Sequence, residues 1–229
     1  MRAILLAAGR GERLRPITDT VPKPLVRIAG RALIEYHLEN LVRAGIGEAV
    51  INLSWLGGQI RATLGAGERF GLAIRYSEEG PVPLETGGGI ARALPLLGSE
   101  PFLVVNADVW TDLEFAALRQ LPAGADASIV LAPNPEHHPE GDFALRDGRV
   151  LEASADRLTY TGIGLYRPEF FTGWPAERFP LRPLLRRAIA AGRLHGQVHR
   201  GEWYDAGSPE RLAWLDAHVR AKGGTGDSR

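Results

Sequence analysis

The sequence predicts an α/β protein with a doubly wound, mixed but mostly parallel sheet that carries helices on both faces. In the first 132 residues, short apolar runs alternate with segments whose apolar residues recur at helical spacing. The runs are apolar throughout, which is typical of parallel strands covered on both faces. Strands that alternate with helices favour a parallel sheet, because parallel neighbours need long crossover connections.

The elements of the first half follow from these runs and their boundaries. Gly45 marks the end of the first long helix, because glycine tolerates the left-handed conformation that commonly ends a helix. Thr111 and Glu114 have the spacing of a capping box, which predicts the start of another helix. Strands are predicted at residues 3–7, 49–53, 72–76, 102–106 and 127–132, and helices at 31–44, 56–64, 88–97 and 112–121.

The pattern changes after residue 133, where a turn-rich loop precedes shorter elements. The turn signal at residues 146–149 predicts a hairpin. We predict one domain at 1–222, with halves at about 1–132 and 133–222, and a disordered tail at 223–229. The predicted elements of the second half are strands at 142–146, 149–153 and 158–166, a helix at 182–191, a pair of strands within 194–205 and a helix from 209.

The composition is typical of a globular protein and excludes several classes of function. The chain carries 27 basic and 27 acidic residues, so it lacks the basic excess of proteins that bind nucleic acids or membrane surfaces. The absence of cysteine excludes disulfides and thiolate metal sites. No apolar run reaches the ~18 residues of a membrane span, and early charges interrupt any signal peptide. We expect a cytoplasmic monomer or small homo-oligomer that acts on small molecules.

A glycine-rich loop follows the first predicted strand and leads to an isolated lysine. Gly9 and Gly11 come where open α/β sheets bind ligands, and backbone N–H groups in such loops can bind phosphate. Leu14 replaces the third glycine of a dinucleotide-binding fingerprint, and no Gly-Lys-Ser/Thr ending of a Walker loop is present. Only two of the 27 basic residues are lysines, and Lys23 lies between two prolines. By itself the loop is also compatible with a surface turn carrying solvated charges.

Two aspartates follow predicted strands, each three residues before a better candidate for capping the next helix. Thr111 begins a capping box after Asp108, and Ser208 with its following proline caps the helix after Asp205. Magnesium is typically held by one or two carboxylates together with phosphate oxygens and waters. Asp108 and Asp205 are therefore predicted to hold Mg²⁺, although each taken singly is also compatible with an ordinary turn residue.

Longer motifs around these residues resemble a known family. The stretches LAAGRGERLRPIT and PKPLV are similar to the N-terminal signature of the sugar-1-phosphate nucleotidyltransferases, and NADVWTD and EWYDAG resemble its two carboxylate segments. LETGGG, FGLAIRYS and HHPEGDF most resemble the short bacterial N-acetylmuramate-1-phosphate uridylyltransferases of cell-wall recycling. The resemblance implies a Rossmann-like nucleotidyltransferase fold. It also implies an enzyme that joins UTP to N-acetylmuramic acid 1-phosphate and releases pyrophosphate, with Mg²⁺ as cofactor.

The resemblance also implies roles for individual residues of the first half, the nucleotide-binding half. Lys23 is expected at the α-phosphate and Arg13 at the β and γ phosphates, as the two catalytic residues. A lysine offers a compact charge for one crowded centre, whereas an arginine offers a planar fork for two oxygens. The expected nucleotide-binding residues are Ala8, Gly9, Gly11, Glu12, Arg13, Lys23, Glu85, Gly87, Gly88 and Asn106.

The second half is expected to bind the sugar phosphate. By resemblance, the sugar-binding residues are Gly141, Asp142, Glu152, Thr161 and Gly162. Many relatives carry a Glu-Lys-Pro segment whose lysine meets the sugar phosphate, but the comparable stretch here, LEASADRL, contains no lysine. In this chain we expect the sugar phosphate to be held instead by the metal, by the backbone, or by an arginine such as Arg15 or Arg200. Two adjacent histidines, His137 and His138, are interpreted as loop residues, because neighbours on extended backbone point apart.

Several alternatives stay open on the sequence alone. The same site could serve another sugar, as in a mannose-1-phosphate guanylyltransferase or a heptose-phosphate enzyme. A catalytically silent subunit that binds nucleotide sugars is disfavoured, because Lys23, Asp108 and Asp205 are all retained. A nicotinamide-dependent oxidoreductase is disfavoured by Leu14.

Overall fold

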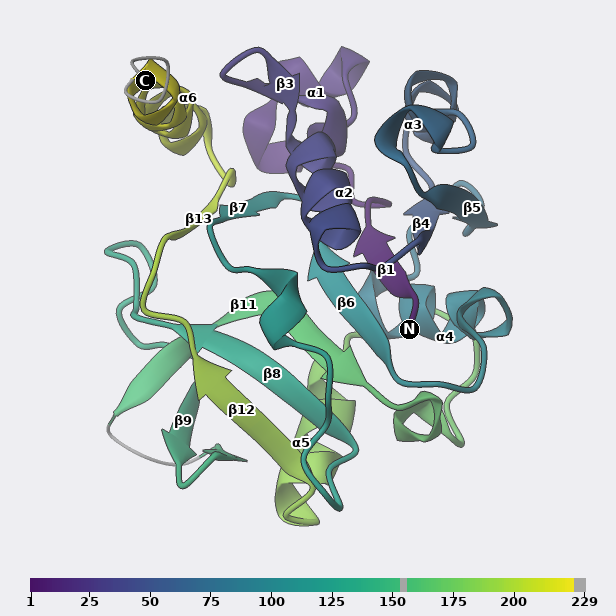
Figure 1. Ribbon diagram of the computed structural model, residues 1–229, viewed down its shortest axis with the longest axis vertical. Helices are drawn as coiled ribbons and strands as arrows, with labels where there is room; N and C mark the ends of the chain where they lie inside the picture. Colours follow the sequence, from purple (N-terminus) through teal and green to yellow (C-terminus); the bar gives the residue numbers. More distant parts are fainter. Residues whose placement is uncertain (153–155, 225–229) are drawn as a thin grey trace.

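A computed structural model of the protein describes residues 1–152 and 156–224. Its centre is a nine-stranded sheet in the order β5-β4-β1-β6-β11-β8-β12-β10-β9, flanked by helices (Figure 1). The strands are β1 (Ala3–Leu6), β4 (Glu48–Leu53), β5 (Ala73–Glu78), β6 (Phe102–Asn106), β8 (Ala127–Ala132), β9 (Phe143–Arg146), β10 (Arg149–Leu151), β11 (Arg157–Tyr166) and β12 (Leu194–Val198). The α-helices are α1 (Ile17–Thr20), α2 (Leu33–Arg43), α3 (Gly57–Leu64), α4 (Glu85–Leu97), α5 (Arg182–Ala190) and α6 (Pro209–Gly224).

The sheet divides into a parallel part and a mixed part. β5, β4, β1 and β6 are parallel neighbours, with Ile4 of β1 facing Val50 of β4 and Val104 of β6. β11 then runs antiparallel to both β6 and β8, and β12 returns parallel to β8. β10 is antiparallel to β12 and to β9. The mixed α/β fold is confirmed, and within the sheet β10 and β11 run opposite to the other strands.

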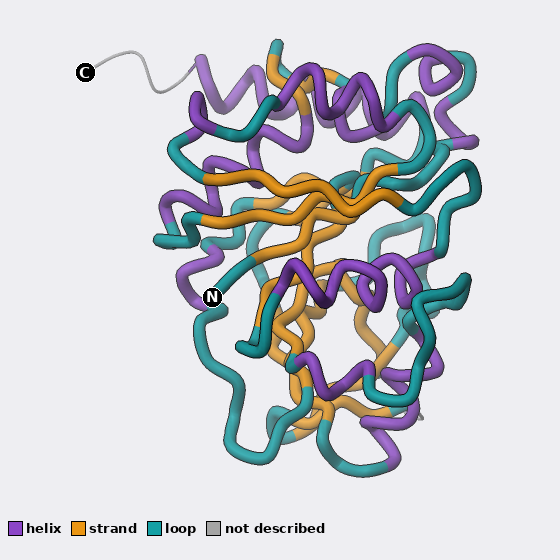
Figure 2. The backbone as a smooth tube through the Cα atoms, turned by 90° about the vertical axis from the view of Figure 1, so that its right-hand side faces the viewer, coloured by secondary structure: helices purple, strands orange, loops and turns teal. Residues whose placement is uncertain are grey.

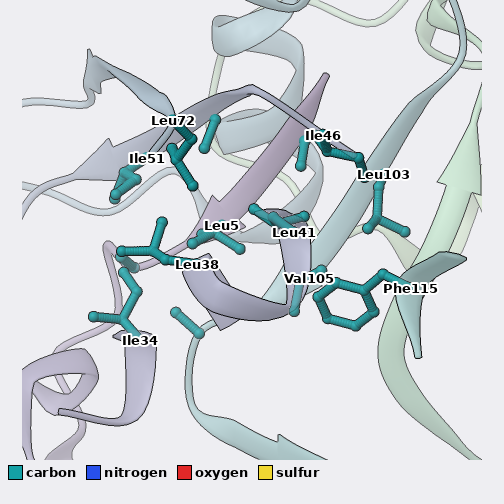
Figure 3. Close-up of a cluster of buried hydrophobic side chains, with 14 of the residues drawn as sticks. Leu5, Ile34, Leu38, Leu41, Ile46, Ile51, Leu72, Leu103, Val105 and Phe115 are labelled. Atoms are coloured by element: carbon teal, nitrogen blue, oxygen red, sulfur yellow. The ribbon is translucent and has the colours of Figure 1, made fainter. Parts of the chain in front are cut away.

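Helices cover both faces of the sheet, and alternate residues of β1, β4, β6 and β8 supply two separate cores. On one face, Leu5 of β1 and Val105 of β6 pack with Ile34 and Leu38 of α2 (Figure 3). On the other face, Ile4 packs in a cluster that contains residues of α4 and α5. The tube view in Figure 2 shows helices on either side of the strands. The sequence explains this arrangement, since strands that are apolar on both faces need a covering layer on each side.

A third, smaller core joins the segment at residues 14–33 to the C-terminal helix α6. Leu215 of α6 is fully buried with Leu14, Ile28 and Leu33. The short hairpin of β2 (Arg27–Ile28) and β3 (Arg31–Ala32) contacts α6, and the Ala29 N–H donates to the Asp216 carboxylate over 2.7 Å. The C-terminal helix therefore supports the segment that follows the glycine-rich loop.

The predicted helix at 112–121 is wrong. β7 (Val109–Thr111) continues past Asp108, and only a 3-10 turn, η4 (Phe115–Ala117), follows it. Thr111 forms no capping box, because its hydroxyl donates to the Glu202 carbonyl. The Asn40 amide of α2 binds the Leu113 carbonyl and the Phe115 N–H, so a distant side chain takes the backbone groups that a helix would use.

Other boundaries also differ from the prediction. The two strands within 194–205 do not pair with each other, since β13 (Trp203–Asp205) pairs with β7 and β12 joins the main sheet. The predicted strand at 149–153 ends at residue 151, and residue 153 lies outside the described part of the chain. α6 extends to Gly224, beyond the predicted start of the tail at 223, and residues 225–229 lie outside the described residues. Among the described helices, none is both long and apolar enough to cross a membrane.

Candidate functional site

A cavity of about 650 Å³ lies at the carboxyl ends of the parallel strands β5, β4, β1 and β6. This edge is where open α/β sheets bind ligands, because the strand ends and the loops that follow them diverge there. The residues that line the cavity are Leu6, Ala7, Ala8, Gly9, Arg10, Gly11, Glu12, Arg13, Leu14, Lys23, Pro24, Asn52, Glu79, Val82, Pro83, Glu85, Thr86, Asn106, Asp108, Arg178 and Gly207.

The glycine-rich loop forms one wall of this cavity. Gly11 has a φ of +65°, and a side chain there would come within 2.9 Å of Thr18 and 3.3 Å of Lys23. The Thr18 hydroxyl also donates to the Gly11 carbonyl over 2.8 Å. Glycine at position 11 therefore allows the loop to pack directly on the segment that carries Lys23. Gly9 has no protein atom within 4 Å of the position a Cβ would take, so its bare backbone faces open space.

Lys23 and Asp108 form an ion pair in the cavity wall. Lys23 begins a 3-10 turn, η2 (Lys23–Leu25), and is only 7% exposed. Its Nζ donates to Asp108 Oδ2 over 2.6 Å, whereas the Asp108 side chain is 39% exposed. A buried ammonium needs such a partner, because the free energy lost by removing the charge from water would otherwise be uncompensated. The pair places a compact positive charge and a carboxylate side by side where a phosphate could reach both.

The two predicted metal-binding aspartates come from adjacent segments. In the β7–β13 pair, Asp205 faces Val109, and the Ala206 N–H donates to the Asp108 carbonyl over 3.0 Å. Asp205 Oδ1 is buried and accepts no hydrogen bond of good geometry from the described residues, although an Arg211 nitrogen lies 3.0 Å away. Two carboxylates are donors that Mg²⁺ accepts together with phosphate oxygens and waters, although Asp108 lines the cavity and Asp205 does not. No cluster of three or more potential metal ligands occurs in residues 1–152 and 156–224.

The His137 side chain reaches Asp205 from the turn-rich loop. Its Nε2 lies 2.8 Å from Asp205 Oδ2, so this loop histidine contacts a predicted metal ligand. His138 points elsewhere, with its Nε2 3.4 Å from Asp142 Oδ2. The two histidines therefore contact different carboxylates, and both lie in the loop, as the sequence predicted.

The glycines of the LETGGG segment have a different role from the predicted one. α4 already begins at Glu85, so Gly87 and Gly88 lie inside its first turns and do not line the cavity. A Cβ on Gly87 would lie 2.3 Å from the Phe179 ring, and one on Gly88 would lie 1.8 Å from the Glu177 carbonyl. These glycines allow α4 to pack against residues 177–179, a long-range contact that the local pattern does not reveal.

The predicted sugar-binding residues lie outside the cavity lining, and most are engaged in structural contacts. Asp142 accepts from the Tyr160 N–H over 2.9 Å, and Glu152 is ion-paired with Arg186. The buried Thr161 hydroxyl donates to the Val130 carbonyl. Gly141 has a φ of +59° and packs closely on Asn134 and Arg157.

Gly162 connects this region to the cavity. Its φ is +77°, and a Cβ there would lie 2.3 Å from Nδ2 of Asn106, which lines the cavity. The other predicted residues that line the cavity are Ala8, Gly9, Gly11, Glu12, Arg13, Lys23, Glu85 and Asp108. The structure therefore brings the predicted nucleotide-binding residues together except for Gly87 and Gly88, and Gly162 lies next to Asn106.

The cavity also contains polar residues that were not among the predicted site residues, namely Arg10, Asn52, Glu79, Thr86 and Arg178. Arg178 is paired with Glu85 at 2.9 Å, while Arg15 and Arg200 do not line the cavity. Asn52 and Glu79 are both buried and hydrogen-bonded to each other over 2.6 Å. Burial raises the pKa of the Glu79 carboxyl above its ordinary value, against the opposing effect of its hydrogen bonds. Asn52 is the penultimate residue of a predicted strand. A polar residue at the end of an otherwise apolar strand is the sequence feature that could have indicated this cavity residue.

Comparisons with known proteins identify the family of the chain. Residues 2–142 match the family model described as nucleotidyl transferase. An N-acetylmuramate alpha-1-phosphate uridylyltransferase from Neisseria meningitidis is 49% identical, over 93% of this chain and 95% of that protein. The catalytic subunit beta of a mannose-1-phosphate guanylyltransferase from Dictyostelium discoideum is 30% identical, over 92% of this chain and 62% of that protein.

A solved structure supports the fold. The structure described as a glucose-1-phosphate thymidylyltransferase from Bacillus anthracis superposes with a TM-score of 0.82, covering 96% of each chain at 20% identity. At that identity the likeness concerns the arrangement of the helices and strands, and the site rests on the residues themselves.

Proposed function

The chain belongs to the nucleotidyl transferase family, and we propose that it joins UTP to N-acetylmuramic acid 1-phosphate, giving the nucleotide sugar and pyrophosphate. The observation that carries the proposal is the Lys23–Asp108 pair in a cavity whose wall is the glycine-rich loop. The Neisseria relative, named for this activity, is more similar than the mannose-1-phosphate guanylyltransferase. We extend the proposal to a cytoplasmic role in peptidoglycan recycling.

The proposed reaction is a displacement at the α-phosphorus of the nucleotide. A phosphate oxygen of the sugar 1-phosphate forms the new bond, and the bond between the α-phosphorus and the oxygen bridging to the β-phosphorus breaks. The leaving pyrophosphate takes the electron pair of that bond. The protein's contribution is to position the phosphates and to neutralise charge that develops during the transfer.

Residues of this chain can divide that work between them. Lys23, held by Asp108, supplies a positive charge for the α-phosphate, and its burial limits how far it can move. Arg13 lies in the 3-10 turn η1 (Glu12–Leu14) at the end of the glycine-rich loop, and its planar guanidinium suits the oxygens of the leaving pyrophosphate. Gly9 leaves backbone N–H groups open to the triphosphate.

We propose that Asp108 and Asp205 hold a magnesium ion. When bound, Mg²⁺ supplies charge neutralisation at the phosphate oxygens. The buried Asp205 Oδ1, without a well-formed hydrogen bond from the described residues, supports this assignment. Arg211 and His137 keep the Asp205 carboxylate in place from the side of the second half.

The opposite wall of the cavity is proposed to bind the base and the sugar phosphate. Residues 82–86 offer apolar contact from Val82 and Pro83 next to the polar Glu85 and Thr86. Arg178 is the cationic side chain that the described part of the second half adds to the lining. We therefore propose Arg178, in place of Arg15 or Arg200, as a candidate contact for an anionic group of the sugar substrate.

Pyrophosphate release across a panel of nucleotides and sugar 1-phosphates tests the proposal. The highest rate is expected with UTP and N-acetylmuramic acid 1-phosphate in the presence of Mg²⁺. A preference for GTP with mannose 1-phosphate would overturn the proposed specificity while keeping the reaction type. No release with any pair would support the alternative of a silent subunit that binds nucleotide sugars.

A further inference from the structure

We infer that Asn52 and Glu79 form a positioning bridge that fixes the two walls of the nucleotide cavity relative to each other. The inference rests on the proposed function, because it concerns how the same cavity holds its nucleotide. Neither residue belongs to the glycine-rich loop, the Lys23 segment or the carboxylate segments. Both are buried side chains at the carboxyl ends of neighbouring parallel strands, and both line the cavity.

The bridge is a continuous chain of hydrogen bonds across three strand ends. The Ala7 N–H, just after β1, donates to Asn52 Oδ1 over 2.6 Å. Asn52 Nδ2 donates to Glu79 Oε1 over 2.6 Å, and the Leu84 N–H donates to Glu79 Oε2 over 2.7 Å. Ala7 leads into the glycine-rich loop, and Leu84 directly precedes α4. The chain therefore connects the phosphate-side wall to the wall formed by residues 82–86.

The adjoining helix is built around this bridge. A Cβ on Gly89 of α4 would lie 2.4 Å from Glu79 Oε1 and 2.8 Å from Asn52 Nδ2. Glycine at position 89 therefore leaves the space that the two side chains occupy. Since both Glu79 oxygens and both Asn52 polar atoms already have protein partners, the pair acts through the backbone groups that it holds.

The polarity of the bridge allows a sharp test. In Glu79→Gln the side chain has a single acceptor oxygen for two donors, Asn52 Nδ2 and the Leu84 N–H. In Asn52→Asp two carboxyl groups face each other without a donor between them. Each single change therefore breaks one hydrogen bond of the chain. The double variant, which combines Asn52→Asp with Glu79→Gln, keeps every bond and the total charge. The new carboxylate at position 52 would accept from the Ala7 N–H and from the new amide at position 79. The carbonyl of that amide would accept from the Leu84 N–H.

Dissociation constants for UTP, measured by titration calorimetry with Mg²⁺, give the readout, with circular dichroism and Tm recorded separately. Each single variant is expected to bind UTP about ten-fold more weakly, and the double variant within about three-fold of wild type. KM for the sugar 1-phosphate should change less than the UTP constant. Asn40→Asp is the matched control, because Asn40 is a buried amide that holds backbone groups outside the cavity. It should lower Tm without changing UTP binding.

Two results would overturn the bridge. One is wild-type affinity for UTP in folded single variants, which would show that the pair contributes only to the stability of the fold. The other is a folded double variant that binds as weakly as either single variant, which would show that the carboxylate must stay at position 79. If a single variant fails to fold, the UTP affinity of the double variant is the test, with affinity within about three-fold of wild type supporting the bridge and about ten-fold weaker binding overturning it. Failure of the wild-type chain itself to bind UTP would overturn the proposed function, and the inference with it.

Discussion

The two halves of the chain contribute to the cavity in different ways. In the first half, the loops after four neighbouring parallel strands converge, and the glycine-rich loop, Lys23 and Asn106 all reach the cavity. In the second half, β11 is reversed between β6 and β8, and Asp142, Glu152 and Thr161 bind other protein groups. A run of parallel strands directs many successive loops to one edge, whereas a mixed sheet sends its loops to both edges.

The sharpest test of the first half is Lys23. Lys23→Arg should lower the rate of pyrophosphate release about 1,000-fold, because a planar guanidinium cannot replace a compact ammonium in this buried position. Circular dichroism should show an intact fold. Lys222→Arg, at the other lysine of the chain, is the control and should keep its rate. Full activity of Lys23→Arg would refute a special role for this side chain.

The next largest effect concerns how the first half is held together below neutral pH. His37 of α2 donates from Nε2 to the Val109 carbonyl, and burial lowers the pKa of its imidazole from 6.5 to about 4. Below pH 6.5 the imidazole of residue 37 is therefore protonated in the unfolded chain but still neutral in the folded one. The free energy of unfolding consequently decreases as the pH falls from 6.5 to about 4. At about 1.4 kcal/mol per pH unit, the loss is about 3 kcal/mol.

Denaturant unfolding at a series of pH values measures this loss. His37→Gln keeps a donor for the carbonyl but does not titrate, so its free energy of unfolding should vary about 3 kcal/mol less over that pH range. His195→Gln, the same substitution at a histidine of β12 that is not buried, is the control. An unchanged slope in His37→Gln would show that other groups cause the acid sensitivity.

The carboxylates test whether the second half completes the metal site. Asp108→Asn and Asp205→Asn should each reduce pyrophosphate release about 100-fold and raise the Mg²⁺ concentration needed for half-maximal rate. Removal of the metal with a chelator should abolish turnover, and added Mg²⁺ should restore it. Asp142→Asn is the control from the second half, since its carboxylate binds the Tyr160 N–H. Normal Mg²⁺ dependence in Asp205→Asn would restrict the metal site to Asp108.

The smallest expected effect lies where the two halves meet. Gly162→Ala would place a methyl group against the Asn106 amide and should lower kcat/KM about ten-fold. Glu152→Gln should change kcat/KM by less than about three-fold, because Glu152 lies outside the cavity lining and is paired with Arg186. A larger loss in Glu152→Gln than in Gly162→Ala would reverse the assignment and return Glu152 to the sugar site.

Local sequence patterns determined the parts that depend on neighbours along the chain. The apolar runs identified the main strands of the first half, and the glycine-rich loop with Lys23 identified the cavity wall, because strand, loop and prolines lie within one short segment. The Mg²⁺ assignment, the single domain with its two halves and the substrate stay predictions. The helix predicted at 112–121 failed because Asn40, far away in the sequence, binds the backbone groups that a helix would have used.

The contacts between residues far apart in the sequence became visible only in the folded protein. It placed Asn52 beside Glu79 and Arg178 beside Glu85, and it brought His137 to Asp205. It also showed that Gly87 and Gly88 serve the packing of α4. Such contacts depend on strand order and on close packing between segments far apart in the sequence. A local pattern records residue types and spacing, but the reversal of β11 and the fit of α4 against residues 177–179 arise only when the whole sheet assembles.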